Sequence, residues 1–299
     1  MTDVRSKIIR FKVGLFSILL LLAVTGAAGP EKKPLTFAVI GDTGTGRPVQ
    51  FEVARQMKAY HDKVGFEFVL MAGDNIYPNG EPALLKPRFE EPYQELLRAG
   101  VKFYAVLGNH DVVKGLEAQT KYEKFNMDGH RYYKFKKGVG LFDFLKGEGL
   151  IEFFALDTTE MNAAQLAWLG ESLTGSKARW KVAFMHKPLY SSAAKHGSTK
   201  SLRPLLEPLL VRYKVDVVFA GHDHVYERIK PQQGIYHFVT GTGGSLRRGN
   251  INRKSRLFAA GNDETNSFLI VEVGESQMKV ECIGANGAVL DSVTIEKKD

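Results

Sequence analysis

The chain has 299 residues, 44% of them hydrophobic and 25% charged, and its formal net charge is +8 because 41 Lys and Arg outnumber 33 Asp and Glu. This composition excludes a wholly disordered chain and a coiled coil, and the length suits one large α/β domain or two small ones. The single cysteine, Cys282, excludes a disulfide within the chain and is expected to be a buried hydrophobic residue of a strand. The positive balance favours small anionic partners, and the absence of a basic and aromatic stripe argues against nucleic acid.

The first 28 residues have the order of a secretory signal peptide. Basic residues come first, an apolar run at 13–24 follows, and small residues end the segment at Ala28. The apolar run is shorter than the roughly 20 residues that span a membrane, so we expect cleavage after Ala28 and a mature domain of residues 29–299 without a stable membrane span. Cleavage removes four basic residues and one acid, which leaves a net charge of 8 − 3 = +5. The expected location is secreted or periplasmic, and an uncleaved N-terminal anchor is the alternative.

The elements expected after the signal alternate between short apolar strands and helices. Strands are expected at 35–40, 66–71, 102–107, 151–156, 180–185 and 215–220, and helices at 49–61, 82–98, 162–173 and 202–213. Pro87 and Pro92 are expected to break the second helix, and Asn162 to cap the third. Residues 112–149 show no clear period and are expected to form a long active-site loop with one hairpin. Further strands are expected at 235–240, 268–273, 278–283 and 288–295. This order predicts an α/β fold, and the continuous apolar strands predict a sheet that is buried on both faces.

Side chains that can bind metal follow five of these strands. They are Asp42 in IGDTG, Asp74 in MAGDNIY, Asn109 and His110 in VLGNHD, His186 in VAFMHKP, and His222 with His224 in FAGHDH. Each block alone is weak evidence, because a lone GD is usually a turn. Ligands of such sheets gather beyond the carboxyl ends of the strands, so the five blocks together predict one site. Carboxylate, amide, imidazole and phenol donors suit Fe, Zn or Mn, and their number exceeds what one ion needs. The sequence therefore predicts two cations that share a carboxylate and hydrolyse phosphate esters.

The motif set GDTG, GDNIY, GNHD, MHKP and GHDH resembles the calcineurin-like metallophosphoesterases. The position of Tyr77 in GD-x-x-Y resembles the tyrosine motif that distinguishes the purple acid phosphatase branch. The segments around the motifs resemble the small single-domain members of this branch, which are tartrate-resistant acid phosphatase-like. The resemblance covers about residues 35–244. It implies a four-layer α-β-β-α sandwich of two mixed β-sheets, with a dinuclear site at the C-terminal ends of the strands.

The resemblance also implies a role for each residue of the site. The first metal, Fe(III) in this family, would be held by Asp42, Asp74, Tyr77 and His224. The second metal, a divalent Fe, Zn or Mn, would be held by Asn109, His186 and His222, with Asp74 bridging the two. A metal-bound hydroxide would be the nucleophile, His110 would contact the phosphate and assist the leaving group, and His196 would be a second substrate contact.

Two further features leave alternatives open. Asp111 either supports catalysis by orienting His110 or caps the next turn. Arg247 and Arg248, in TGTGGSLRRG, either form a solvated basic loop or reach a substrate anion.

Three functions are compatible with these residues. The first is an acid phosphatase that acts on phosphate monoesters, with small phosphorylated compounds, phosphoproteins or nucleotides as substrates. The second uses the same site as a phosphodiesterase or nucleotide pyrophosphatase, because the pocket walls and not the ligands set the class of ester. The third is a metal- or phosphate-binding protein without turnover, which is disfavoured because every expected ligand and His110 are present.

Overall fold

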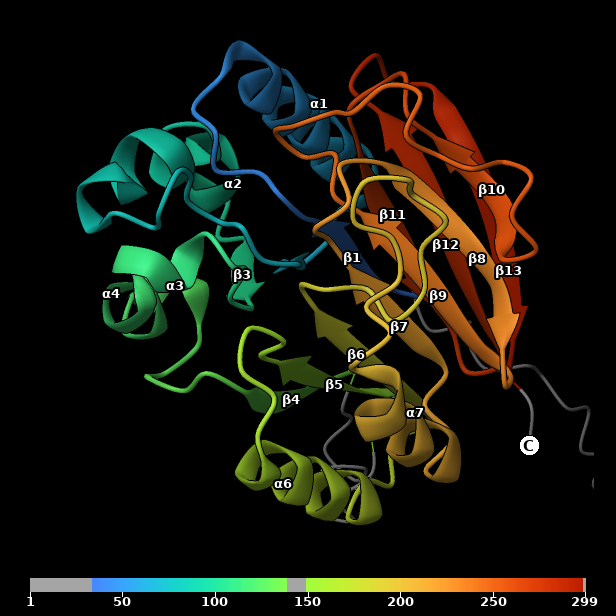
Figure 1. Ribbon diagram of the computed structural model, residues 1–299. Coiled ribbons are helices and arrows are strands. Elements are labelled where there is room, and N and C mark those ends of the chain that lie inside the picture. The colour runs from blue at the N-terminus through green and yellow to red at the C-terminus, as the bar shows by residue number, and fades with distance from the viewer. Residues whose placement is uncertain (1–33, 139–148, 298–299) are drawn as a thin grey trace, which may run out of the picture. The chain divides into compact units, whose positions relative to one another are not determined.

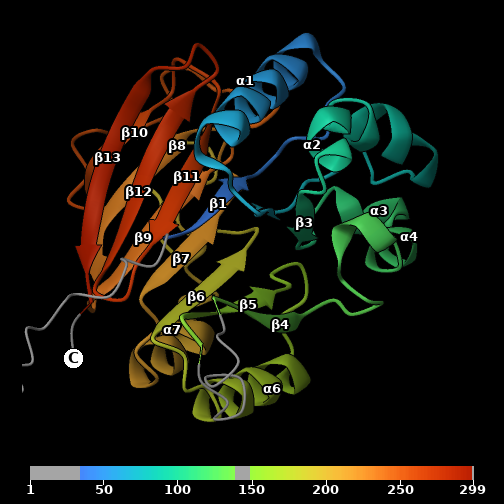
Figure 2. The ribbon, with the colours of Figure 1, turned by 180° about the vertical axis from the view of Figure 1, so that it is seen from behind.

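Two mixed β-sheets lie face to face at the centre of the fold (Figures 1 and 2). The computed structural model describes residues 34–138 and 149–297, which belong to one compact unit, Pro34–Asp299. The first sheet has the order β13 (Val289–Glu296), β12 (Gln277–Gly284), β11 (Ser267–Val273), β1 (Leu35–Ile40), β2 (Phe68–Met71) and β3 (Lys102–Ala105). The second has the order β10 (Phe258–Asn262), β8 (Tyr226–Gln232), β9 (Ile235–Thr240), β7 (Val217–Ala220), β6 (Trp180–Met185), β5 (Ile151–Leu156) and β4 (Tyr133–Lys137). The proposed signal peptide lies outside the described residues.

The core between the sheets follows from the alternation of side chains along each strand. Phe37 of β1 points toward the second sheet, whereas Ile40 points to the outer face. The Phe37 ring stacks on Phe68 at 5.1 Å and meets Phe153 of β5 edge-on at 5.2 Å. Such aromatic pairs add about 0.5–1.5 kcal/mol each beyond the burial of their area. Cys282 is buried in the same layer, as expected from its strand.

Helices cover the outer faces of both sheets. Helix α1 (Pro48–Val64) packs Val53 and Met57 on the outer face of the first sheet. Helices α6 (Ala163–Thr174) and α7 (Arg203–Arg212) pack on the second sheet through Leu169 and Leu206. The side chain of Asn162 accepts the N–H of Gln165 and caps α6 as expected. The four-layer α/β sandwich predicted from the resemblance is therefore confirmed.

The strand directions place the site. In the first sheet β1, β2 and β3 are parallel to one another, and in the second β5, β6, β7 and β9 are parallel. The other strands, β11, β12 and β13 of the first sheet and β4, β8 and β10 of the second, are joined by antiparallel pairing. The N–H of Gly41, just after β1, donates to the carbonyl of Thr240 at the end of β9 at 3.0 Å. The carboxyl ends of the two parallel sets therefore meet, and the loops that carry the candidate ligands leave from this edge.

One expected helix is broken as anticipated, whereas a long segment and two strands differ from the expected elements. The helix expected at 82–98 is divided into η1 (Pro82–Leu84), η2 (Lys86–Glu90) and α2 (Gln94–Arg98), and Pro92, one of the two prolines expected to break it, lies between η2 and α2. Residues 112–138, the described part of the stretch expected to be a long loop, are more ordered than a loop. They include most of α3 (Asp111–Lys114), α4 (Leu116–Thr120), η3 (Glu123–Phe125) and β4, which pairs antiparallel with β5. Strands β8 and β10 were not expected at all.

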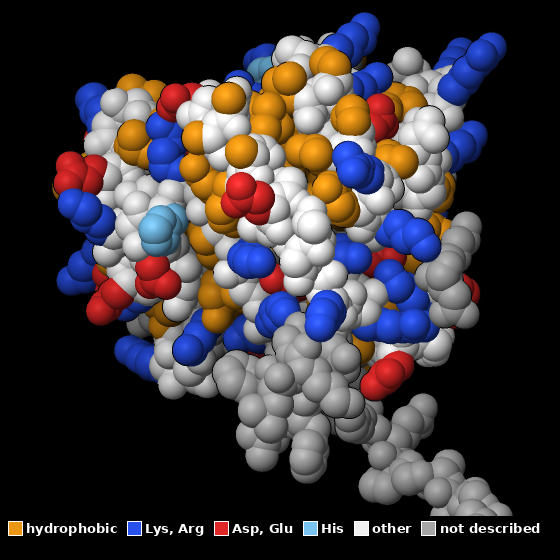
Figure 3. Space-filling model, turned by 90° about the horizontal axis from the view of Figure 1, so that it is seen from below, with side chains coloured by type: hydrophobic (Ala, Val, Ile, Leu, Met, Phe, Trp, Pro, Cys, Tyr) orange, Lys and Arg blue, Asp and Glu red, His pale blue; other side chains and the backbone are white. Residues whose placement is uncertain are grey.

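Two observations concern the helices and one face of residues 34–138 and 149–297. None of their helices is both long and apolar enough to cross a bilayer. On the face drawn in Figure 3, Lys and Arg side chains are interspersed with acidic, polar and hydrophobic ones.

Candidate metal centre

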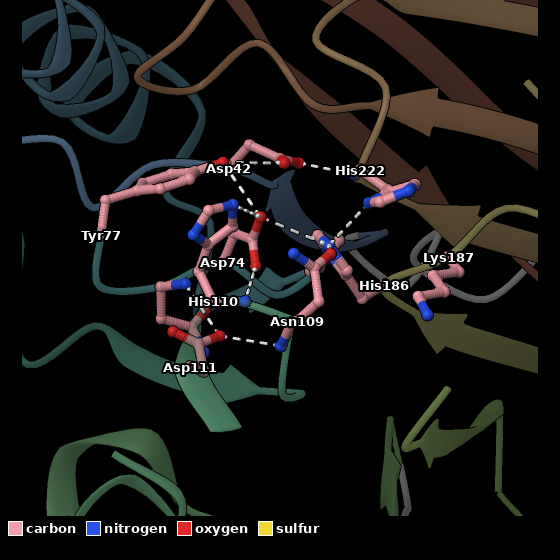
Figure 4. A network of polar contacts seen from close by, with 12 residues as sticks. Asp42, Asp74, Tyr77, Asn109, His110, Asp111, His186, Lys187 and His222 are labelled. Carbon is pink, nitrogen blue, oxygen red and sulfur yellow. Dashed lines mark hydrogen bonds and ion pairs between the residues drawn. The ribbon is translucent and has the colours of Figure 1, made fainter. Parts of the chain in front are cut away.

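Each ligand-type side chain lies in the loop directly after a strand. Asp42 follows β1, Asp74 and Tyr77 follow β2, Asn109 and His110 follow β3, His186 follows β6, and His222 and His224 follow β7. The loops are tied to one another, since the N–H of Asp42 donates to the Gly73 carbonyl at 3.0 Å and the N–H of His222 donates to Asp42 Oδ2 at 2.8 Å. The side chains consequently converge on one point (Figure 4).

Two glycines beside candidate ligand residues, Gly73 and Gly221, lie against a candidate ligand residue of another loop. A Cβ atom on Gly73 would lie 2.7 Å from His186 Nδ1. A Cβ atom on Gly221 would lie 2.5 Å from Asp42 Oδ2. Both distances are far below van der Waals contact, so the recurring glycine of the sequence blocks reflects close packing between loops from different strands.

A first group of donor atoms surrounds the phenol oxygen of Tyr77. This oxygen lies 3.1 Å from Asp42 Oδ1, 3.0 Å from Asp74 Oδ2 and 3.1 Å from His224 Nε2. His224 Nε2 lies 3.3 Å from Asp42 Oδ1. These are the four residues that the resemblance implies for the first metal.

A second group surrounds Nε2 of His186. This atom lies 3.1 Å from Asn109 Oδ1, 3.2 Å from His222 Nδ1 and 3.4 Å from Asp74 Oδ2. The Nδ1 atom of His186 is 2.9 Å from the Ala72 carbonyl, so the ring donates its Nδ1 proton there and Nε2 is the atom directed at the group. Asp74 Oδ2 belongs to both groups and therefore occupies the position of a bridging carboxylate.

The donor set fits a pair of hard or borderline cations. Asp42, Asp74 and His186 are buried and each offers one donor atom within 4.8 Å of the others. Within the described residues no Lys or Arg forms an ion pair with either carboxylate, whose ion-pair partners are histidines. Buried carboxylates this close need cationic compensation, and oxygen and nitrogen donors without thiolate suit Fe, Zn or Mn.

The protonation of the Tyr77 phenol depends on whether cations compensate the charges of Asp42 and Asp74. Burial raises the pKa of the phenol well above its ordinary value, and the charges of Asp42 and Asp74 raise it further. The phenol alone therefore keeps its proton and donates it to the carboxylates. A strongly polarising cation is required for a phenolate at this position.

The pKa values of the two histidines of the second group, buried His186 and half-buried His222, are shifted in opposite directions. Burial lowers the pKa of His186, but the charge and hydrogen bond of Asp74 outweigh it and raise the pKa to about 9. Burial and the positive charges of His186 and His196 lower the pKa of His222 to about 3. For Asp74, burial acts to raise the pKa, but the charges and hydrogen bonds of His186 and His110 outweigh it, so the pKa is lowered.

His110 lies at the edge of both groups. Its Nδ1 atom is 2.6 Å from the Pro78 carbonyl, and its Nε2 atom is 4.0 Å from Asp74 Oδ2. The ring packs on Tyr77 with centroids 4.6 Å apart, and 41% of the side chain is exposed. With Nδ1 occupied by a backbone carbonyl, Nε2 is the atom that can reach a substrate.

Asp111, expected either to orient His110 or to cap the next turn, places its carboxylate between two loops. Its Oδ2 accepts the N–H groups of Gly108 at 2.8 Å and Asn75 at 3.0 Å. Its Oδ1 accepts the N–H of Ile76 at 2.9 Å and the amide of Gln119 at 2.9 Å. Burial raises the pKa of Asp111 to about 6, and the charge of Asp74 acts in the same direction, while the N–H donors oppose it. Because this carboxylate is buried and committed to these donors, it ties the GDNIY loop to the GNHD loop and positions residues rather than reacting.

His196 borders the second group without joining it. Its exposed ring lies 4.4 Å from the His222 ring, and no hydrogen bond links it to either donor group within the described residues. Burial lowers the pKa of His196, the charge of Asp223 opposes this, and the positive charges of Arg247 and Lys195 lower it further. The role of His196 as a second substrate contact stays a prediction.

The sequence did not indicate the hydrogen-bond acceptors that orient the imidazole rings of the site. They are the Ala72 and Pro78 carbonyls, which orient the rings of His186 and His110. A backbone carbonyl has no residue-type signal, so only the three-dimensional contacts reveal these partners. Gln119 was missed for a related reason. Its side-chain amide donates to Asp111, eight positions earlier in the chain, and no local sequence pattern indicates this hydrogen bond.

The facing sheets, with the donor groups at their carboxyl edge, are the arrangement of a metallophosphoesterase. A model of the calcineurin-like phosphoesterase family matches residues 35–226. The chain belongs to this family, of which a dinuclear metal site is typical.

Two curated proteins that are similar to this chain are acid phosphatases. Purple acid phosphatase 4 of Arabidopsis thaliana is 32% identical over 253 residues, which cover 75% of this chain and 72% of the relative. Tartrate-resistant acid phosphatase type 5 of Homo sapiens is 25% identical over an alignment 319 positions long. The alignment covers 94% of this chain and 95% of the relative. The chain is thus related to the purple and tartrate-resistant acid phosphatases over most of its length.

Solved structures share the fold. GAP50, described as the anchor in the inner membrane complex of Plasmodium, superposes with a TM-score of 0.79 at 22% identity, over 90% of each chain. Purple acid phosphatase PPD1 from yellow lupin (Lupinus luteus) seeds superposes with a TM-score of 0.72 at 19% identity, over 88% of this chain and 53% of that one. These similarities concern the arrangement of the sheets and helices.

Proposed function

We propose that this protein is an exported acid phosphatase that hydrolyses phosphate monoesters at the candidate metal centre. The observation that carries the proposal is the position of Asp74 Oδ2, which lies 3.0 Å from the Tyr77 phenol oxygen and 3.4 Å from His186 Nε2. One buried carboxylate oxygen shared by two groups of donors is the arrangement that a pair of adjacent cations requires. The kinship to acid phosphatases supports the choice of monoesters.

The proposed cofactors are Fe(III) and a divalent Fe, Zn or Mn. Asp42, Asp74, Tyr77 and His224 would hold the first, and Asn109, His186 and His222 would hold the second, with Asp74 shared. When bound, the two ions supply charge neutralisation for the phosphoryl group and lower the pKa of water toward neutrality. Tyr77 favours Fe(III) over a divalent ion at the first position, because its pKa is raised so far that only a strongly polarising cation would ionise it.

The residues around the two donor groups would position the substrate and donate a proton to its leaving group. His110 is the proposed general acid, because its Nε2 atom faces Asp74 and solvent while the Pro78 carbonyl holds Nδ1. His196 is the proposed second contact to the phosphate ester, beside His222. Asp111 keeps the loops of Asp74 and His110 in register through its buried carboxylate.

Phosphate release by metal-loaded protein tests this proposal. We expect the wild type to release phosphate from an aryl monoester, and Asp74→Ala and His222→Ala to lose both the activity and bound metal measured by elemental analysis. His130→Ala is the matched control, because His130 is exposed and lies outside both donor groups. Release that persists in the two site variants would show that the chemistry occurs elsewhere.

A substrate panel distinguishes the alternatives. An aryl monoester, an aryl diester and a nucleotide pyrophosphate should be compared at equal metal loading. We expect the largest kcat/KM for the monoester. A preference for either of the other two would assign the same site to a phosphodiesterase or pyrophosphatase, and phosphate binding without release from any ester would assign a binding function.

A further inference from the structure

The loop after β9 borders the metal centre from a side that the five sequence blocks do not cover. The N–H of Gly244 donates to the Asp42 carbonyl at 3.0 Å, and the N–H of Arg247 donates to the His224 carbonyl at 2.9 Å. Thr45 adds a hydrogen bond from its hydroxyl to the Gly244 carbonyl at 3.2 Å. These bonds fix the backbone of Arg247 next to two residues of the first donor group.

The two arginines of this loop have different environments. Arg248 is exposed, and its guanidinium faces Glu264, with Nη1 3.9 Å from the carboxylate and Nη2 donating to the carbonyl at 3.4 Å. Arg247 is half-buried, and its buried Nη1 has no hydrogen-bond partner among residues 34–138 and 149–297. The expected solvated basic loop therefore describes Arg248 and not Arg247. A buried guanidinium N–H without an acceptor is unfavourable, so this position is suited to receive an anion.

Arg247 and His196 both contact the loop of residues 222–224. The ring of His196 packs on His222 with centroids 4.4 Å apart, and the N–H of Arg247 donates to the His224 carbonyl at 2.9 Å. The two residues therefore border the same loop of the metal centre. No acidic side chain pairs with the Arg247 guanidinium within the described part of the chain, so its charge is available.

We propose that Arg247 binds an oxyanion of the phosphorylated substrate and completes the substrate site on the side of His196. This inference rests on the proposed function. The planar fork of a guanidinium matches phosphate or carboxylate oxygens with two parallel hydrogen bonds, which an ammonium group cannot do. The oxyanion belongs either to the reacting phosphoryl group or to a second anionic group on the part of the substrate that leaves.

The test compares metal-loaded full-length Arg247→Gln with Arg248→Gln, a matched control that removes the same charge from the neighbouring residue. The probes are inorganic phosphate, measured by equilibrium dialysis, and the hydrolysis of para-nitrophenyl phosphate and para-carboxyphenyl phosphate. A charged hydrogen bond to an anion corresponds to a change of about tenfold or more. We expect Arg247→Gln to raise Kd or KM by this factor, Arg248→Gln to stay within about twofold of wild type, and Arg247→Lys to recover part of the loss. Thermal unfolding of each variant controls for the fold.

The outcomes separate the two proposals. Equal losses with all three probes place Arg247 on the reacting phosphoryl group, and a loss confined to para-carboxyphenyl phosphate places it on the leaving group. If the wild type hydrolyses the esters and Arg247→Gln equals Arg248→Gln with every probe, the role of Arg247 is overturned and the proposed function stands. If the wild type binds phosphate and hydrolyses neither ester, the proposed function is overturned, and dialysis alone decides whether Arg247 holds the anion.

Discussion

Replacing Gly73 by alanine should displace His186 and remove the second metal. Gly73 has φ +82°, and an added Cβ would lie 2.7 Å from Nδ1 and 2.8 Å from Cγ of His186. His186 is fully buried and cannot move aside. A left-handed backbone is unfavourable for alanine by about 1–2 kcal/mol, and overpacking in a tight site adds about 1–3 kcal/mol. We therefore expect Gly73→Ala to lower the free energy of unfolding by about 2–5 kcal/mol.

Gly100→Ala provides the matched control for this prediction. Gly100 has φ +81°, nearly the same backbone conformation, but an added Cβ would meet no atom within 4 Å. Urea denaturation of the metal-free proteins should thus give a loss of only about 1–2 kcal/mol for Gly100→Ala, and elemental analysis should find its metal content unchanged. Equal free energies of unfolding for the two variants, with full metal content in both, would refute the view that glycine is required here for the approach of His186.

Further predictions concern Tyr77, Asp111, acid pH and metal removal. Tyr77→Phe should abolish the visible charge-transfer band of the iron-loaded protein, and a band that survives would exclude Tyr77 as an iron ligand. Asp111→Asn places an amide NH₂ against two of the N–H donors that the carboxylate accepts, so urea denaturation should show a loss of about 2–6 kcal/mol; a change below about 1 kcal/mol would contradict this. Burial, with the charge of Arg203, lowers the pKa of His237 to about 3, so the unfolded state takes up a proton below about pH 6.5 that the folded state does not. Stability should therefore fall as the pH decreases from 6.5 toward 3, by about 2 kcal/mol between pH 7 and 5, and His237→Phe should flatten this dependence in urea titrations. Chelation should lower the thermal midpoint, because the buried carboxylates lose their compensating charge, and added metal should restore it; identical midpoints would argue against metal binding.

The alternation of strands and helices could be predicted from the sequence because hydrophobic periodicity is a local property. The expected strand at 35–40 and the helix capped by Asn162 agree with β1 and α6. Strand β8 was missed because its pattern includes Arg228 and other polar residues. The guanidinium of Arg228 is paired with Asp291 of β13, at 2.7 Å from Nε to Oδ2. A polar residue that is satisfied by a partner so distant in the chain carries no local strand signal.

Which side chains stand at the ends of strands, and hence which types of donor the site can use, follows from the sequence alone. A side chain that follows an apolar run lies at the strand end in any sheet that the run can form, so this information is local. Three outcomes depend on the packing of the folded chain: the donors divide into two groups around Asp74, Asp111 holds loops together, and Nη1 of Arg247 is buried while Arg248 is exposed. Those outcomes depend on contacts such as that between Asp42 and the N–H of His222, 180 positions apart in the chain. Distances of this kind are set by the packing of two sheets and not by any neighbouring residue.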